Sequence, residues 1–295
     1  MPDKVQYKEG SNVEFIIKNQ INLADNETYF VLEDKNGRKQ LLKADYYKKY
    51  NLKIGSKVNC KIDHINCAGK IFIEPKHPYY EEGKIYNFTI NELKIIKNRL
   101  GKDALLIRTL DKLNNIAFCK IEYEDFSKFE LHQQINCKVE LIKKSKLYLT
   151  FINSKNKSKE IGKFYDFIIK NIKTLTDNFM YYILEDNEKK EYILRFEYYT
   201  HHNLQIEQKI KCRLVKFSSE GYYIIEPKHP FYKINKIYDF KILTQKKDNI
   251  TGNYNITVED VYKQEVKFVA SKHFTDKKIS CKTIGLKKGK PLLSI

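Results

Sequence analysis

The chain has 295 residues, a length at which two or three domains of ordinary size are expected. Hydrophobic residues make up 42% and charged residues 31%, and an aromatic content of 13% separates the chain from disordered polypeptides. No apolar run approaches the ~18 residues of a spanning helix, so that class of membrane protein is excluded. The polar N-terminus shows no secretory signal, so we expect a cytoplasmic protein with reduced thiols.

The net charge of +18 favours an anionic partner, most often a nucleic acid. The basic residues are 50 Lys and only 5 Arg. Lysine acts as a point charge on phosphate, whereas arginine is the usual bidentate reader of guanine. This balance predicts a protein that contacts the phosphate backbone and reads little sequence. A bias in coding composition is the competing explanation for the lysines.

Two sequence markers recur in the same order along the chain. The first marker reads GSNVEFII, GKIYNFTI, GKFYDFII and NKIYDFKI, beginning at residues 10, 83, 162 and 235. The second marker places one cysteine at an equivalent position in each copy, namely Cys60, Cys137, Cys212 and Cys281. The pattern predicts four repeat units, covering residues 1–82, 83–161, 162–234 and 235–295.

The four units form an alternating series. Units one and three share the motifs LED and EPKHP, the latter at residues 74–78 and 226–230. Units two and four instead share a lysine-rich turn, in Leu141–Leu149 and Gly285–Leu293. Units one and three each have a net charge of +2, and units two and four each have +7. We therefore interpret the chain as a duplicated pair of unlike units.

Each unit is predicted to contain five strands and one short helix, in a fixed order. The first strand carries the alternation Tyr86, Phe88 and Ile90, which is typical of a half-buried strand. In unit one, the later strands are expected at residues 28–34, 40–44, 58–62 and 71–75, with a helical segment at Ala44–Leu52 before the fourth. Proline ends the fifth strand, because it cannot donate to a ladder.

Three strands, a helix and two strands within ~75 residues is the order of the OB-fold. The phrase L-x-I-G-x-K-V-x-C-K-I at Leu52–Ile62 resembles the RNA-binding repeats of the ribosomal-protein S-one type. The resemblance covers nearly the whole chain in four copies. It implies an all-β protein of four tandem five-stranded OB-fold (Greek-key) barrels, each with a short helix between strands three and four. It also implies RNA as a ligand.

OB-folds bind on strands two and three, between the one–two and four–five loops. Cations for phosphates are expected in the four–five turns of units two and four, at Lys143, Lys144, Lys146, Lys287, Lys288 and Lys290. Further cations are expected in the one–two loops of these units, at Lys94, Lys97, Lys246 and Lys247. Tyr29 and Tyr181 are expected to point outward and to stack on bases, with simple coverage of the barrel as the alternative.

The remaining reactive residue types fit structural roles. The repeated cysteines lie too far apart in sequence for a metal motif, so we expect them in the cores. His77 and His229 of EPKHP are expected to pack at the junctions between barrels. No nucleotide-binding loop or catalytic motif is present in the sequence.

The sequence therefore predicts a non-catalytic nucleic-acid-binding protein without cofactor, metal or membrane partner. The expected ligand is RNA or single-stranded DNA, bound with weak sequence preference. The alternative is a protein-interaction scaffold or an accessory subunit of a larger nucleic-acid-handling assembly. Its protein partners would bind units one and three.

Overall fold

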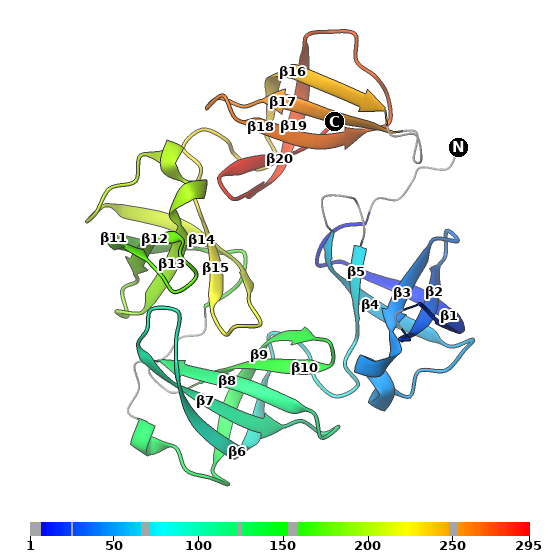
Figure 1. Ribbon diagram of the computed structural model, residues 1–295, viewed down its shortest axis with the longest axis vertical. Coiled ribbons are helices and arrows are strands. Elements are labelled where there is room, and N and C mark those ends of the chain that lie inside the picture. Colours follow the sequence, from blue (N-terminus) through cyan, green and yellow to red (C-terminus); the bar gives the residue numbers. More distant parts are fainter. Residues whose placement is uncertain (1–6, 25, 66–70, 123–125, 153–158, 248–252) are drawn as a thin grey trace. The chain divides into compact units, whose positions relative to one another are not determined.

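The computed structural model describes residues 7–24, 26–65, 71–122, 126–152, 159–247 and 253–295. Within these residues the chain is all-β, and its strands form four five-stranded sheets (Figure 1). Each sheet contains five consecutive strands. The second sheet is a closed barrel, which agrees with OB-like architecture.

The first two sheets use the strands up to Phe151. The first sheet has the order β3-β2-β1-β4-β5 and contains β1 (Asn12–Asn22), β2 (Thr28–Asp34), β3 (Lys39–Lys43), β4 (Lys57–Ile65) and β5 (Ile71–Pro75). The second is closed by parallel pairing of its third and fifth strands and contains β6 (Ile85–Lys97), β7 (Asp103–Leu110), β8 (Ile116–Glu122), β9 (Gln134–Lys143) and β10 (Lys146–Phe151).

The last two sheets repeat the strand order of the first. The third sheet contains β11 (Phe164–Thr174), β12 (Met180–Glu185), β13 (Glu191–Arg195), β14 (Lys209–Phe217) and β15 (Tyr223–Pro227). The fourth contains β16 (Ile237–Lys247), β17 (Tyr254–Glu259), β18 (Glu265–Ala270), β19 (Lys278–Lys287) and β20 (Lys290–Ser294).

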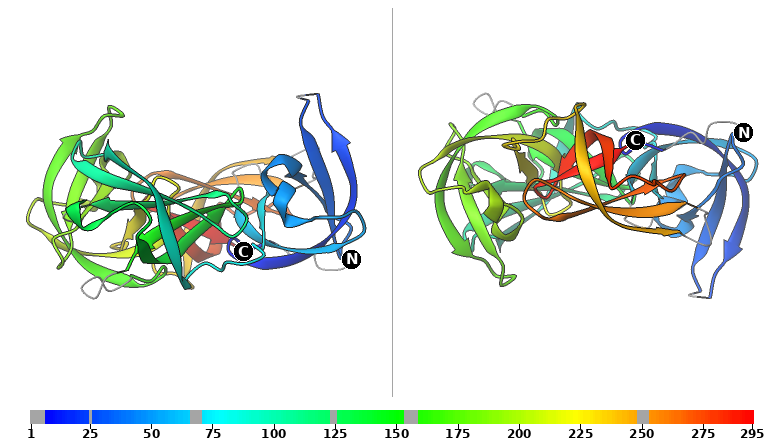
Figure 2. Two further views of the ribbon diagram at one scale, coloured as in Figure 1. Left: turned by 90° about the horizontal axis from the view of Figure 1, so that it is seen from below. Right: turned by 90° about the horizontal axis from the view of Figure 1, so that it is seen from above.

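The first strand of every sheet has two partners. Its N-terminal half pairs with the fourth strand and its C-terminal half with the second. In each sheet the pairing of the first strand with the second has a bulge directly after the last apolar residue of the repeated marker. This residue is Ile17, Ile90, Ile169 or Ile242. Such a bulge bends the strand, which lets one strand serve both sides of a barrel. The bending is visible in β1 and β2 (blue) in Figure 2.

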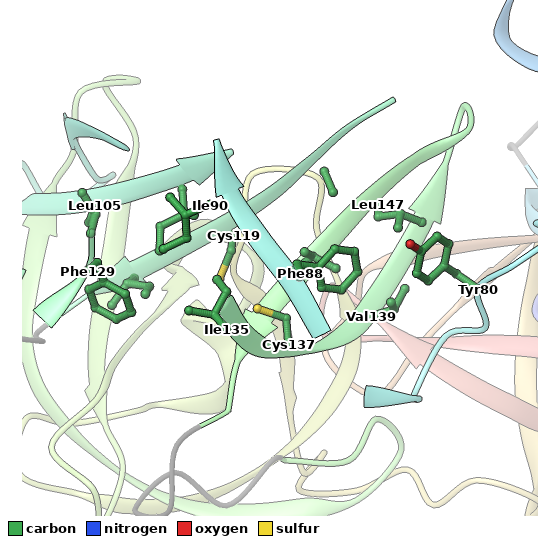
Figure 3. Close-up of a cluster of buried hydrophobic side chains, with 14 of the residues drawn as sticks. Tyr80, Phe88, Ile90, Leu105, Cys119, Phe129, Ile135, Cys137, Val139 and Leu147 are labelled. Atoms are coloured by element: carbon green, nitrogen blue, oxygen red, sulfur yellow. The ribbon is translucent and has the colours of Figure 1, made fainter. Parts of the chain in front are cut away.

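The repeated cysteines lie in the cores. Figure 3 shows Cys137 among the apolar side chains of the second sheet, beside Cys119 and Ile135. The cysteines at the repeat position are all fully buried, namely Cys60, Cys137, Cys212 and Cys281. Burial raises the pKa of the Cys281 thiol to about 11. The expectation of core packing is confirmed for these residues, while Cys67 lies outside the described part of the chain.

The prediction of a short helix in every unit is wrong for the fourth. The helical segments are short 3-10 helices: η1 (Ala44–Tyr50), η2 (Phe126–Lys128), η3 (Phe196–Tyr198) and η4 (Thr200–His202). In the fourth sheet, residues 271–277 join β18 directly to β19 without a helical turn. The corresponding segment of the first sheet spans residues 44–56, which leaves room for a helix.

The chain divides into two compact units, one holding the first and second sheets and the other the third and fourth. This division follows the duplicated pair that the sequence indicates. Each predicted range, 1–82, 83–161, 162–234 and 235–295, contains the strands of one sheet, and the boundaries themselves stay a prediction. Among the described residues, no helix has the length and apolar character to cross a membrane.

Candidate nucleic-acid interface

A buried glutamate at the end of β5 holds the lysine-rich hairpin of the next sheet. Glu74 is 7% exposed and belongs to the EPKHP motif. Its Oε2 accepts the backbone N–H of Lys144 at 2.8 Å, and its Oε1 accepts that of Ser145 at 3.1 Å. The hydroxyl of Tyr47, in η1, donates to Oε2 at 2.9 Å. The β9–β10 turn is therefore docked on the first sheet.

The second compact unit repeats this arrangement. Glu226 is the penultimate residue of β15, and its Oε1 accepts the backbone N–H of Gly289 at 2.8 Å. Its Oε2 accepts the N–H of Lys288 at 3.1 Å and the hydroxyl of Tyr199 at 2.9 Å. The same three donors thus meet the same acceptor in both units, and the β19–β20 turn is docked on the third sheet.

The two glutamates experience opposing electrostatic effects. Burial raises the pKa of Glu74 to about 7 and also raises the pKa of Glu226. The hydrogen bonds from the hairpin backbone and from tyrosine act in the other direction, because they favour the charged carboxylate. Docking of the hairpin therefore stabilises the negative charge of a carboxylate that burial alone would neutralise.

Both docked turns have the geometry of a two-residue hairpin. Their central residues have positive φ, at Lys144 (52°) and Ser145 (62°) in one turn and at Lys288 (54°) and Gly289 (73°) in the other. This pattern is typical of a type I′ turn, which matches the twist of the strands it joins. A Cβ atom on Gly289 would lie 2.4 Å from the backbone oxygen of Tyr198. Glycine at this position allows the close approach of hairpin and 3-10 helix.

We expect Gly289→Ala to lower the free energy of unfolding by more than about 3 kcal/mol, because it combines strained φ with a backbone clash. The matched control is Gly55→Ala, since Gly55 also has positive φ (+83°) but has nothing within 4 Å of its Cβ position. That variant is expected to lose about 1–2 kcal/mol. Urea unfolding of both variants measures the difference, and equal losses would show that the close approach at Gly289 does not constrain the fold.

In the first compact unit, the docked hairpin places a lysine above a tyrosine ring. Lys144 Nζ lies 5.0 Å from the centroid of Tyr46, whose side chain is 36% exposed. Lys43 Nζ approaches the same ring at 5.2 Å from the end of β3, and Lys43 also pairs with Glu27. Both distances are within the range of cation–π attraction.

The second compact unit contains the same grouping. Lys288 Nζ lies 4.8 Å from the centroid of Tyr198, and the guanidinium carbon of Arg195 lies 5.1 Å from it. Arg195 also pairs with Glu197 at 3.0 Å. We call these two groups the cation–tyrosine clusters: Lys43, Tyr46 and Lys144 in the first unit, and Arg195, Tyr198 and Lys288 in the second.

The other lysines predicted in the four–five turns lie in or beside the two hairpins. Lys143 Nζ is 3.8 Å from Asp63, and Lys146 Nζ is 5.9 Å from the ring centroid of Phe118. Lys290 Nζ donates to the backbone oxygen of Glu265 at 3.0 Å. Lys287 is the exposed last residue of β19. The turns are therefore basic as expected, but their backbone N–H groups are already hydrogen-bonded to Glu74 and Glu226. Nucleic-acid contact by their side chains stays a prediction.

The expectation that four further lysines lie in one–two loops is wrong. Lys94 and Lys97 belong to β6, where they pair with Leu106 and Asp103. Lys246 and Lys247 likewise belong to β16. The bulge lets these first strands continue beyond Ile90 and Ile242, so the lysines occupy strand positions.

The expected outward orientation is also wrong for Tyr181. Its side chain is 5% exposed, and its hydroxyl donates to Asp177 Oδ2 in the β11–β12 turn at 2.6 Å. Burial and this hydrogen bond raise the pKa of Tyr181 to about 12. Tyr29 is half-buried, with its hydroxyl 3.5 Å from Glu27. The turn that accepts the Tyr181 hydroxyl makes this ring unavailable for stacking on a base.

The EPKHP histidines pack at the junctions, as expected. His77 contacts the rings of Tyr50 and Tyr80, and its Nε2 donates to Asp111 of the second sheet at 3.3 Å. Burial opposes ionisation of Asp111, but the hydrogen bonds from His77 and from the following turn hold its pKa below its usual range. His229 packs in the same way against Tyr232.

Three histidines of the second compact unit bring their ring nitrogens within 4.8 Å of one another, namely His201, His202 and His229. The hydrogen bonds of His201 and His229 oppose metal ligation. His201 Nε2 donates to the backbone oxygen of Gly289 at 3.2 Å, which leaves Nδ1 to accept from Gln264 at 3.0 Å. His229 Nδ1 accepts two backbone N–H groups, so its Nε2 carries the proton. The ring lone pairs of His201 and His229 are therefore already engaged, whereas the buried Nε2 of His202 has no hydrogen-bond partner among the described residues.

Sequence reasoning missed Tyr46 and Tyr198 as site candidates. Both belong to a repeated Tyr-Tyr pair at the same place in units one and three, preceded by a cation at Lys43 or Arg195. That repetition was a usable signal. The partner cations of the hairpins are roughly 90 or more residues away in sequence, so only the folded chain shows that they share a ring.

Comparison with known proteins adds little. No family model and no curated protein matches the chain. One solved structure, a multidomain protein with nucleic acid binding domains from Streptococcus pneumoniae TIGR4, is similar over 77% of this chain and 76% of its own. It is 9% identical and has a TM-score of 0.28, values at which the similarity carries no argument about this chain.

Proposed function

We propose that this chain is a non-catalytic nucleic-acid-binding protein built from four tandem OB-like barrels. The observation that carries the proposal is the pair of cation–tyrosine clusters. In both compact units, a buried glutamate fixes a basic hairpin so that one lysine lies over a partly exposed tyrosine. The grouping recurs with centroid distances of 5.0 and 4.8 Å.

The clusters offer the two contacts that single-strand binding requires. Lysine ammonium groups can contact phosphates, and a tyrosine ring can stack on a base, which contributes about 1–3 kcal/mol per base. Because the hairpin backbone is already ordered by Glu74 or Glu226, less conformational entropy is lost on binding. Lysine-dominated contacts favour weak sequence preference.

Two clusters on one chain also allow avidity. A strand long enough to engage both converts the second contact into an intramolecular step, which increases the overall affinity without any new type of contact. The preferred ligand is therefore a long RNA or single-stranded DNA rather than a short oligonucleotide.

A protein-interaction scaffold is the second candidate function. Ile54 and Ile206 occupy equivalent positions in units one and three, and their side chains are 61% and 52% exposed. Such residues mark a protein contact site where they belong to a larger exposed apolar patch. These units also have the lower net charge, which suits a protein partner better than a polyanion.

Fluorescence anisotropy with labelled RNA, single-stranded DNA and duplex DNA of about 30 nucleotides, longer than the site of one OB-fold, tests the proposal. We expect both single strands to bind more tightly than the duplex, because only unpaired bases can stack on Tyr46 and Tyr198. Preference for the duplex would contradict the stacking role. Absence of binding to all three at low salt would reject the proposed function in favour of the scaffold.

A further inference from the structure

Two lysines of like charge face each other on the outer surface of the fourth sheet. Lys241 of β16 pairs directly with Lys278 of β19 in the antiparallel register, and both side chains are exposed. Like charges in directly opposite positions destabilise a sheet. The nearest acid to Lys241 is Glu259, at 4.0 Å. An anion placed between the two ammonium groups would relieve their repulsion.

Lys282 continues this basic surface along β19. We call it the β16–β19 lysine strip, which comprises Lys241, Lys278 and Lys282, the lysines at alternate positions on the outer face of these two strands. All three side chains are exposed. Within the described part of the chain, no carboxylate lies within ion-pair distance of the strip lysines other than Lys241. From Lys278 to Lys282 the strip follows β19 for about 13 Å.

The equivalent surfaces of the first and third sheets are neutralised by acids. In the first sheet Glu14 pairs with Lys57 at 2.9 Å, and in the third Asp166 pairs with Lys211 at 3.1 Å. In the fourth sheet the equivalent acid, Asp239, accepts the Ser280 hydroxyl at 2.5 Å instead. Among the described residues, no ion pair joins Asp239 to Lys241 or Lys278, whereas the equivalent acids of the first and third sheets each pair with a lysine of the neighbouring strand.

The residue opposite the β19 lysine also differs among the sheets. The position of Lys241 is occupied by Ile16, Thr89 and Ile168 in the other three sheets. Opposed lysines at this position are therefore a feature of the fourth sheet alone among the four registers. Elsewhere in the described strand registers, opposed lysines occur beside the two hairpin turns, as Lys143–Lys146 and Lys287–Lys290. The Lys241–Lys278 pair lies away from any hairpin turn, on the open face of the sheet, where a repulsive pair points to a role in binding.

We propose that the β16–β19 lysine strip is a second contact surface for the phosphodiester backbone, distinct from the cation–tyrosine clusters. This inference rests on the proposed function and extends the bound strand over the fourth sheet. A linear row of cations is the feature with which proteins follow a nucleic-acid backbone without reading its sequence. Asp239 lies on the same face, and the three strip lysines outnumber it.

The double variant K241Q/K278Q tests the proposal, with K209Q as the matched control. Lys209 occupies the position of Lys278 in the third sheet and is also exposed, but it faces Ile168. With single-stranded RNA, we expect the double variant to reduce the slope of log affinity against log salt by about 1.4, at ~0.7 per lost phosphate contact. Affinity at 0.1 M salt should then fall roughly 25-fold, and K209Q should change neither quantity.

A thermal melt guards against misfolding. Removal of two opposed charges should leave the melting temperature unchanged or raise it, so weaker binding by an equally stable protein would support the strip. Wild-type affinity and slope in the double variant would overturn the strip and leave the proposed function intact. If K209Q weakens binding by half as many logarithmic units as the double variant, binding depends only on the total charge of the protein. That result would also overturn the strip. No binding by the unmodified protein would reject the proposed function, and the strip with it.

Discussion

Replacing Glu74 and Glu226 together by alanine is expected to release both lysine-rich hairpins and to lower the stability of each compact unit by about 2–4 kcal/mol. Each substitution leaves two backbone N–H groups and one tyrosine hydroxyl without their acceptor. A buried donor without a partner costs about 1–3 kcal/mol, and water entering the opened junction recovers part of this. Urea unfolding of the single and double variants measures the loss.

Glu14→Ala is the control for loss of a negative charge. Glu14 forms an exposed ion pair with Lys57, which is expected to contribute less than about 1 kcal/mol. Unfolding of the double variant within about 0.5 kcal/mol of the unmodified protein would contradict the docking role of the two glutamates.

The same double variant separates preorganisation from charge. It lacks two carboxyl groups and is therefore more positive than the unmodified chain, so simple electrostatics predicts tighter binding to nucleic acid. We expect weaker binding instead, because Lys144 and Lys288 are no longer held over their tyrosines. Tighter binding would show that the ordered clusters are not the binding sites.

The second large effect is expected from the quadruple variant K143Q/K144Q/K287Q/K288Q. Glutamine removes the positive charge without placing new carboxylates beside Glu74, Glu226 or Asp63. Loss of four phosphate contacts should reduce affinity for a single strand about 10²–10³-fold at 0.1 M salt, because each contact releases counterions. Anisotropy titrations at this salt concentration measure the change.

The matched control for this variant replaces four exposed lysines that form no ion pair or cation–π contact within the described part of the chain, namely Lys35, Lys53, Lys173 and Lys216. Its net charge equals that of the quadruple variant, so long-range attraction is weakened equally. A similar loss in both variants would mean that binding depends on overall charge and would contradict the assignment of the hairpin lysines.

The strands and the cores could be predicted from the sequence because their signals are local and repeated. Alternation around Phe88, and cysteine at one position in every unit, depend on neighbours within a few residues. Four copies of each signal fixed their order along the chain. The absence of a helix from the fourth unit could not be inferred in this way, because the shortness of residues 271–277 is apparent only once both flanking strands are placed.

The candidate site depends on contacts that the sequence does not contain. Glu74 meets Lys144 some 70 residues later, and nothing in EPKHP identifies a hairpin backbone as its partner. Tyr181 illustrates the opposite error, since strand alternation placed it outward but the β11–β12 turn covers it. Lysines such as Lys97 were assigned to loops because a bulge, which sequence alternation hides, lengthens the strand.

Nucleic-acid binding by a charged, ordered surface is the central claim, and its salt dependence is the most direct test. For the unmodified chain and a labelled single-stranded RNA, we predict that log affinity falls linearly with log salt, with a slope of about −3 to −6 for four to eight phosphate contacts. A slope near zero, or no binding at low salt, would contradict the claim and leave the net charge of +18 without a nucleic-acid role.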